Sequence, residues 1–237
     1  LGQYILEETL SPVREEKEGD GLSQGIVVIL QDKTKTRQLE DEIAYQNALI
    51  HEVHHRVKNN LQTIISLVGL EAAQTKNEEI KAFARTITSR IRSISVTYDL
   101  LAHSETENVE LQTMLVRLAR DWMENKNVGE CKVQVEICGD SLELAANTAS
   151  TVSLIINELI QNSMKYAFPN RDTGTIWLTV ERGNKSSWIT VRDDGCGVDE
   201  KRRNSPGGGL GLQLVRSLVR SSLKGEIDFS SSSKGTV

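Results

Sequence analysis

The sequence predicts an α+β protein with several domains: a β-hairpin, then an α-helical hairpin, then an α/β sandwich. Two apolar strands precede residue 31, apolar residues recur at helical spacing between residues 38 and 101, and strands alternate with helices from residue 132 onward. We therefore expect domains at residues 1–37, 38–105 and 106–237.

The first segment is expected to hold two strands, at residues 3–10 and 25–30, joined by a polar turn. A two-stranded hairpin is barely stable by itself, so we expect it to belong to a larger sheet. The chain opens on Leu1 rather than on methionine and stops at Val237 near a strand start, so we also expect it to be part of a longer protein.

Residues 38–74 are predicted to form one long helix with a single apolar stripe. Its two seam positions hold Ile43, Ile50, Val57 and Ile64, and Gln46, Val53, Asn60 and Leu67. Residues 75–77 interrupt the pattern, and a second helix carries an apolar stripe at Ile80, Ala84, Ile87, Ile91, Ile94, Tyr98 and Leu101. Because two helices cover each other incompletely, we expect a homodimer that completes a four-helix bundle, or else a monomer shielded by the other domains.

The heptad positions place His55 on the outer face of the first helix and His54 beside the buried stripe. Glu52 lies three residues before His55 and Asn59 four residues after it, so these side chains can meet at helical spacing. An outward histidine on a charged helix is most often solvated surface, so this cluster alone is a weak sign of a phosphoryl acceptor.

The rest of the chain has the pattern of a sandwich, with helices on one face of a mixed sheet. We expect helices at residues 109–122, 147–168 and 209–223, and strands at residues 132–137, 175–181, 187–192 and 226–229.

Composition excludes several classes of function. A net charge of -5 and a pI near 5.5 argue against direct binding of nucleic acid or anionic lipid. No apolar run approaches the length of a membrane span, and none has the layout of a signal peptide. Three scattered cysteines match neither a disulfide framework nor a thiolate zinc site, which favours a reducing, cytoplasmic location.

Residues 157–168 form the first of three polar clusters in the last domain. Glu158, Asn162 and Lys165 follow one another at four and three residues, so an acid, an amide and an ammonium share one helix face. An amide oxygen suits Mg²⁺, and a lysine can neutralise phosphate charge. Taken alone, such a face is more often plain surface.

The second cluster, residues 191–197, is a strand that runs into an acidic turn broken by glycine. A carboxylate such as Asp193 can accept a hydrogen bond from an exocyclic amine such as the adenine amino group. Gly195 and Gly197 permit close approach of the backbone to a flat base. An ordinary Asp-Gly turn is the alternative interpretation.

The third cluster is the glycine-rich run at residues 207–212, which opens a predicted helix. Glycines there allow backbone N–H groups to face phosphates at the positive end of the helix. A glycine run by itself is equally typical of a flexible linker.

In order and spacing the three clusters resemble the N, G1 and G2 boxes of the ATP-binding fold shared by gyrase, a heat-shock chaperone family, MutL and histidine kinases. Together with His54-His55-Arg56-Val57-Lys58-Asn59-Asn60-Leu61-Gln62, they resemble sensor histidine kinases of the HisKA_2 type over residues 38–237. Residues 25–34 resemble the exit of a PAS sensor domain into a signalling helix, with an ordinary edge hairpin as the alternative.

The resemblance implies a role for each matching residue. His55 would accept the phosphoryl group, Asn162 would bind Mg²⁺, and Asp193 would contact adenine. The other residues implied to bind ATP are Lys165, Tyr166, Gly195, Gly197, Gly209, Leu210 and Gly211.

One departure from the family pattern leaves the proton acceptor open. Many classical histidine kinases have an acid directly after the phosphoacceptor, but Arg56 stands there in this sequence. Glu52, His54 and Glu158 are the candidates for the general base.

The implied function is autophosphorylation of His55 from Mg-ATP, followed by transfer to an aspartate of a response regulator in a two-component system. Asn59 could instead orient water against a phosphorylated partner, which would give phosphatase activity. A second alternative is a non-catalytic dimeric scaffold that binds nucleotide. A serine kinase of the anti-sigma type shares the ATP fold but lacks the long histidine-bearing hairpin.

Overall fold

The computed structural model describes residues 5–17, 21–104, 108–124, 132–169, 171–197, 210–232 and 235–237. Two compact units divide the chain, Leu1–Glu52 and Val53–Val237. Helix α1 (Thr34–Gln74) contributes residues to both units.

The first unit holds an antiparallel hairpin of β1 (Leu6–Lys17) and β2 (Gly21–Asp32), so both expected strands are present and are longer than expected. The Asp32 carboxylate accepts a hydrogen bond from the Thr34 backbone N–H at 2.9 Å, which caps the start of α1. Hydrogen bonds from Thr34 hold the pKa of Asp32 below its ordinary value. The strand therefore passes into the helix through a defined cap.

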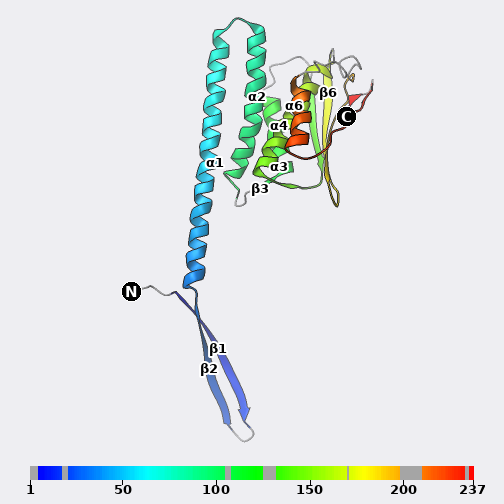
Figure 1. Cartoon of the computed structure of the whole chain (residues 1–237). Coiled ribbons are helices and arrows are strands. Elements are labelled where there is room, and N and C mark those ends of the chain that lie inside the picture. Colours follow the sequence, from blue (N-terminus) through cyan, green and yellow to red (C-terminus); the bar gives the residue numbers. More distant parts are fainter. Residues whose placement is uncertain are drawn as a thin grey trace. The chain divides into compact units, whose positions relative to one another are not determined.

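The helical hairpin in the second unit consists of the later part of α1 and α2 (Glu78–Leu101) (Figure 1). Asn77 is the N-cap of α2, because its side-chain oxygen accepts from the backbone N–H groups of Glu79 at 2.8 Å and Ile80 at 3.4 Å. The expected break at residues 75–77 is confirmed.

The buried face of α1 differs from the predicted stripe. Ile65 is the α1 residue that is fully buried, whereas Val53, Ile64 and Leu67 of the predicted seam are exposed. Ile65 follows Ile64 directly, so the buried side lies about 100° around the helix from the predicted stripe. The other side stays open to solvent in a single chain.

A three-stranded mixed sheet forms one layer of the last domain. Its strands are β4 (Lys132–Gly139), β6 (Thr173–Arg182) and β7 (Ser187–Asp193), in the order β4-β6-β7. β4 and β6 are parallel because α4 (Ala146–Tyr166) crosses between them, and β6 and β7 are antiparallel. Three of the four strands expected in this domain are confirmed.

Helices cover one face of this sheet. They are α3 (Leu111–Glu124), α4 and α6 (Leu210–Ser221), which lie on the same side of the strands in Figure 1. Alternate residues of β6 point into the helices, and the core contains fully buried Met114, Leu115, Ile160, Ile176 and Leu178. The resulting α/β sandwich confirms the expected fold class.

The expected strand at residues 226–229 is wrong, because this segment has no strand assignment. Ile227 is half-buried and packs against Ile155, Val215 and Val219 of α4 and α6. The alternation of polar and apolar residues therefore reflects side-chain packing on helices, not pairing in a sheet. The sequence pattern did not predict two short antiparallel strand pairs. These are β3 (Asn108–Glu110) with β5 (Glu143–Ala145), and β8 (Ser231–Ser232) with β9 (Gly235–Thr236).

Among the helices in the described ranges, none combines the length and apolar character that a membrane crossing requires.

Candidate functional site

His55 lies exposed on α1, as the heptad positions predict, while His54 is half-buried with its ring 5.8 Å from that of Tyr98. The ring of His55 lies 5.7 Å, centre to centre, from the ring of His103, and the two planes meet at 75°. His103 follows the end of α2, and sequence reasoning missed it because nothing in the pattern after Leu101 connects it to α1.

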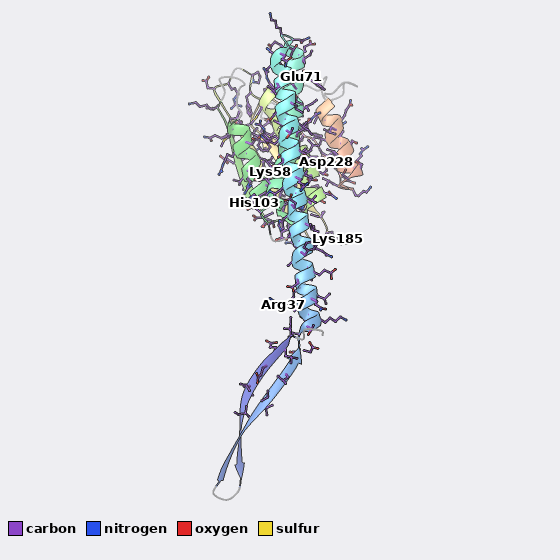
Figure 2. All side chains as sticks on the ribbon, turned by 90° about the vertical axis from the view of Figure 1, so that its left-hand side faces the viewer. Arg37, Lys58, Glu71, His103, Lys185 and Asp228 are labelled. Atoms are coloured by element: carbon purple, nitrogen blue, oxygen red, sulfur yellow. The ribbon has the colours of Figure 1, made fainter. Side chains whose placement is uncertain are left out.

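Asp99 joins three helices just beside this pair of histidines. Its carboxylate binds Lys58 of α1 through one oxygen and Arg117 of α3 through the other, the latter at 2.6 Å. Lys58 is one turn after His55 on α1, and Asp99 is one turn before His103 on α2. Figure 2 shows Lys58 and His103 at the same level of the hairpin. Charged groups therefore fix the helices around His55.

The predicted nucleotide face is assembled on the second half of α4. A Cβ added at Gly211 would lie 2.7 Å from Oε2 of Glu158 and 3.8 Å from Nδ2 of Asn162, so the first turn of α6 passes directly over these side chains. A larger residue at position 211 would displace one of them. The start of α6 thus brings backbone N–H groups to the Asn162 face.

Asn162 carries an unused hydrogen-bonding group. Its amide nitrogen is buried and makes no hydrogen bond within the described part of the chain. A buried amide that the protein itself does not satisfy suits a ligand, since its nitrogen can donate to a phosphate oxygen and its oxygen can coordinate Mg²⁺. The residues present therefore fit the expected metal and phosphate chemistry.

The carboxylate of Glu158 is bound by a residue of α2. Arg90 donates two hydrogen bonds of 2.7 Å to its two carboxylate oxygens, and Glu158 is only 4% exposed. The hydrogen bonds to Glu158 raise the pKa of Arg90 above its ordinary value, so the guanidinium stays charged. In this arrangement Arg90 neutralises the carboxylate that was a candidate base.

A polar network continues the contact between α2 and α4. The Asn157 side-chain oxygen accepts hydrogen bonds from Trp122 at 2.9 Å and from Ser89 at 3.1 Å, and Gln161 donates to Ser89. Sequence reasoning missed this network, because Ser89 and Arg90 are unremarkable positions on a helix until α4 lies against them.

Asp193 is held at the end of β7 with its carboxylate buried. Ser163 of α4 donates to one oxygen at 2.8 Å, and the backbone N–H groups of Gly195 and Thr236 donate to the other at 3.0 and 3.2 Å. A carboxylate has about four acceptor sites, so capacity remains for an amine. Ser163 and Thr236 are further residues that the sequence did not single out.

The neighbouring Asp194 serves the fold. It accepts from the Thr175 backbone at 2.8 Å and from Arg171 at 3.2 Å, which ties the loop after β7 to β6. Gly195 packs on the end of α4, where a Cβ would lie 2.4 Å from that of Ala167. Gly197 has a φ of +74°, which glycine adopts without strain. These contacts favour Asp193, not Asp194, as the ligand-binding acid.

The remaining predicted site residues are exposed or lie outside the part of the chain that the structure describes. Asn59, Lys165 and Tyr166 are exposed, and so is Glu52, which ends the first compact unit. Gly209 and the side chain of Leu210 lie outside the described residues. The structure thus brings Glu158, Asn162, Asp193, Gly195 and Gly211 together around one end of α4.

The two halves of the site contact opposite faces of α2. Arg90, which binds α4, and Asp99, which binds α1, are nine residues apart. That spacing corresponds to about half a circle around the helix and about 13 Å along it. His55 and the Asn162 face are therefore not brought together in this arrangement.

Two family models match this chain. The HisKA_2 model, described as "Histidine kinase", matches residues 52–126. A model described as "Histidine kinase-, DNA gyrase B-, and HSP90-like ATPase" matches residues 147–237. Together they cover more than half of the chain.

Among curated relatives, the sensor histidine kinase PdtaS of Mycolicibacterium smegmatis is 32% identical over 208 residues, which are 87% of this chain and 42% of the relative. Blue-light-activated histidine kinase 2 of Erythrobacter litoralis is 28% identical over 193 residues, covering 78% of this chain and 54% of the relative. The chain thus spans about half the length of these relatives.

A solved structure of the histidine kinase domain of a blue-light-activated histidine kinase from Erythrobacter litoralis superposes with a TM-score of 0.55 at 26% identity. The match covers 83% of this chain and 92% of the solved chain. The likeness extends over both the helical hairpin and the sandwich.

We predict that Arg90→Met lowers the free energy of unfolding of the second unit by about 3 kcal/mol, because it leaves the buried Glu158 carboxylate unpaired. Chemical denaturation measures the effect. The matched control is Arg92→Met on the same helix, whose ion pair with Asp121 is longer, at 3.5 Å, and more exposed; its cost should stay below about 1 kcal/mol. Equal losses in the two variants would contradict the prediction.

A second prediction concerns acid stability. Burial acts to raise the pKa of Asp99, but the hydrogen bond and charge of Lys58, with Arg117 and His103, outweigh it and lower the pKa below the ordinary value. The stabilisation is therefore present above the unfolded pKa and is lost as pH falls through the lower folded pKa, from about pH 5 downward.

In Asp99→Asn, the unfolding free energy that is lost as pH falls should be smaller than in the parent, by about 1 kcal/mol or less, since the partners of Asp99 are partly exposed. Unfolding measured between pH 3 and 6, at about half-unit steps, tests it. Asp228→Asn, which removes an exposed carboxylate elsewhere, controls for the loss of one charge. An unchanged acid slope in Asp99→Asn would refute the assignment.

Proposed function

The chain belongs to the histidine kinase family, and from this premise we propose that it autophosphorylates His55 from Mg-ATP. The observation that carries the proposal is the pairing, within one chain, of an exposed His55 on the hairpin with the nucleotide face at Asn162. Because ATP is the donor, we place the reaction in the cytoplasm.

Residues of the last domain would bind the nucleotide. Asp193 would accept a hydrogen bond from the adenine amino group, Asn162 would hold Mg²⁺, and the start of α6 at Gly211 would donate backbone N–H groups to phosphate. Bound Mg²⁺ would neutralise charge on the phosphates. Lys165, exposed near the end of α4, adds positive charge at the same end.

We propose that the arrangement described above is a resting state. The contact of Arg90 with Glu158 holds the nucleotide face on the side of α2 opposite to Asp99. Phosphoryl transfer therefore requires that α4 separates from α2, or that the nucleotide domain of another copy approaches His55. Separation also frees Glu158 to act as a base.

In the whole protein, we propose, the phosphohistidine passes its phosphoryl group to an aspartate of a response regulator. Residues 1–37 would be the end of a PAS-like sensor domain, residues 38–105 the dimerisation and phosphotransfer hairpin, and residues 106–237 the ATP-binding domain. The Asp32 cap between β2 and α1 supports a direct connection from sensor to helix.

Phosphatase activity is the second candidate. Asn59 is exposed one turn after His55, which is the placement needed to orient water toward a phosphoryl group held at His55 or on a docked partner. The activity would be lost in Asn59→Ala while autophosphorylation remained.

We predict that γ-labelled ATP with Mg²⁺ labels His55, and that His55→Gln abolishes the label. Asn162→Ala and Asp193→Ala should reduce labelling at least a hundredfold, because they remove the metal ligand and the adenine contact. Site mapping and acid lability of the label identify phosphohistidine. Nucleotide binding by the parent without any labelled histidine would favour the scaffold alternative.

The hairpin also supports a homodimer. Several large apolar side chains of the hairpin are exposed in a single chain: Val53, Ile64, Leu67, Leu70, Ile80 and Phe83. Leu67 is 57% exposed and Phe83 is 61% exposed. A second hairpin would cover such a stripe in a four-helix bundle.

We predict that the parent sediments as a dimer and that Leu67→Arg shifts it to monomer, because a buried charge in the bundle is unfavourable. Analytical ultracentrifugation at micromolar concentration provides the measurement. Val116→Arg on α3, an equally exposed apolar position outside the hairpin, should leave the dimer intact. A monomeric parent would instead support shielding by other domains.

A further inference from the structure

The neighbour that the structure gives His55 is another histidine. His103 lies with its ring centre 5.7 Å from that of His55, edge toward face, and both side chains are exposed to solvent. His55 lies on α1, and His103 lies in the turn after α2. At this spacing the edge of one ring approaches the face of the other, and hydrogen bonds of catalytic groups commonly shorten in the reactive complex.

The hydrogen bonding of His103 fixes which nitrogen can accept a proton. Nδ1 lies 2.7 Å from the backbone carbonyl oxygen of Asp99, and a carbonyl can only accept. Nδ1 therefore carries the hydrogen, and Nε2 of the neutral ring keeps its lone pair. The backbone of His103 is held as well, by a 3.1 Å hydrogen bond from its N–H to the carbonyl of Leu100.

A carboxylate lies close to the ring of His103. The Asp99 carboxylate lies 3.8 Å from Nδ1, on the same helix. Lys58 from α1 and Arg117 from α3 also bind this carboxylate, and they keep it ionised. The arrangement of backbone carbonyl and carboxylate is the one that orients and supports an imidazole as a general base.

Two of the three candidate bases that the sequence offers are less well placed than His103. Glu158 is bound to Arg90 on the opposite side of α2, and the ring of His54 lies against Tyr98 rather than His55. Arg56 stands where many histidine kinases have an acid. A base on the second helix of the hairpin would stay beside His55 whether or not α4 leaves α2.

We propose that His103 is the proton acceptor for His55 in the autophosphorylation reaction, an inference that rests on the proposed kinase function. One ring nitrogen of neutral His55 forms a bond to the γ-phosphorus, and the bond from that phosphorus to the bridging oxygen breaks, so ADP leaves with the electron pair. The proton on the other nitrogen of His55 moves to Nε2 of His103. His103 becomes an imidazolium beside Asp99 and later returns its proton to solvent.

His103→Asn tests the proposal. The asparagine amide can still donate to the Asp99 carbonyl, but it offers no basic nitrogen at the position of Nε2. The initial rate of His55 labelling by γ-labelled Mg-ATP should fall by about a hundredfold or more. The KM for ATP should be unchanged. His51→Asn, which removes another histidine of α1, controls for a general effect of losing an imidazole.

The pH dependence provides a readout that a structural role would not change. Both His55 and His103 must be neutral for the reaction in the parent. A plot of the logarithm of the labelling rate against pH should therefore rise with a slope approaching about two on the acid side. In His103→Asn, where only His55 must be neutral, the slope should be about one. Asp99 beside His103, its partners Lys58 and Arg117, and Glu52 and Arg56 near His55 on α1 are the same in both proteins. The rates are measured between about pH 5.5 and 8.

The outcomes separate the two hypotheses. A parent that incorporates no label at His55 overturns the kinase function itself. A labelled parent with a His103→Asn variant of equal rate and equal acid slope overturns only the role of His103. Label found on His103 in the parent would also overturn it, because the residue would then be an acceptor of phosphoryl and not of the proton.

Discussion

The ion pair between Arg90 and Glu158 is the constraint on which the arrangement of the second unit depends. It is bidentate, with two bonds of 2.7 Å, and it joins the middle of α2 to the middle of α4. Removing two charges from water is costly, and such pairs often contribute little net stability compared with apolar residues of the same size. Their effect is on specificity, because any other register between the helices would leave a buried charge unpaired. The network through Ser89, Asn157 and Trp122 adds the same requirement.

This register between α2 and α4 explains why His55 and Asn162 lie on opposite sides of α2. α2 presents Asp99 to the helix that carries His55 and Arg90 to the helix that carries Asn162, on faces about half a circle apart. One helix therefore contacts both the helix that carries His55 and the helix that carries Asn162, and the two contacts lie on separate faces. A signal that alters the packing of α1 against α2 acts on the same helix that holds α4, so the two events can be coupled through rigid-body movement.

How far the sequence predicts this structure depends on the range of each interaction. Heptad spacing is local, and it correctly placed His55 outward and His54 beside the core. The same counting left Ile65 out of the predicted stripe, because the side of α1 that is covered depends on which elements pack against it. Residues 226–229 alternate like a strand, yet Ile227 packs on helices. Arg90, Ser163 and His103 gave no signal at all, since each acquires its partner only when elements distant in sequence meet.

The choice of proton acceptor illustrates that limit most clearly. Sequence reasoning searched for a base close to His55 in the chain or within a known motif, and Arg56 left that search open. In the folded hairpin, the Asp99 carboxylate lies 3.8 Å from Nδ1 of His103, the ring of His103 lies beside that of His55, and Lys58 of α1 binds the same carboxylate. A carboxylate that follows the histidine directly travels with it on one helix. An acid and a base on the second helix instead depend on the packing of the hairpin, so a change in that packing would alter proton transfer as well as access to ATP.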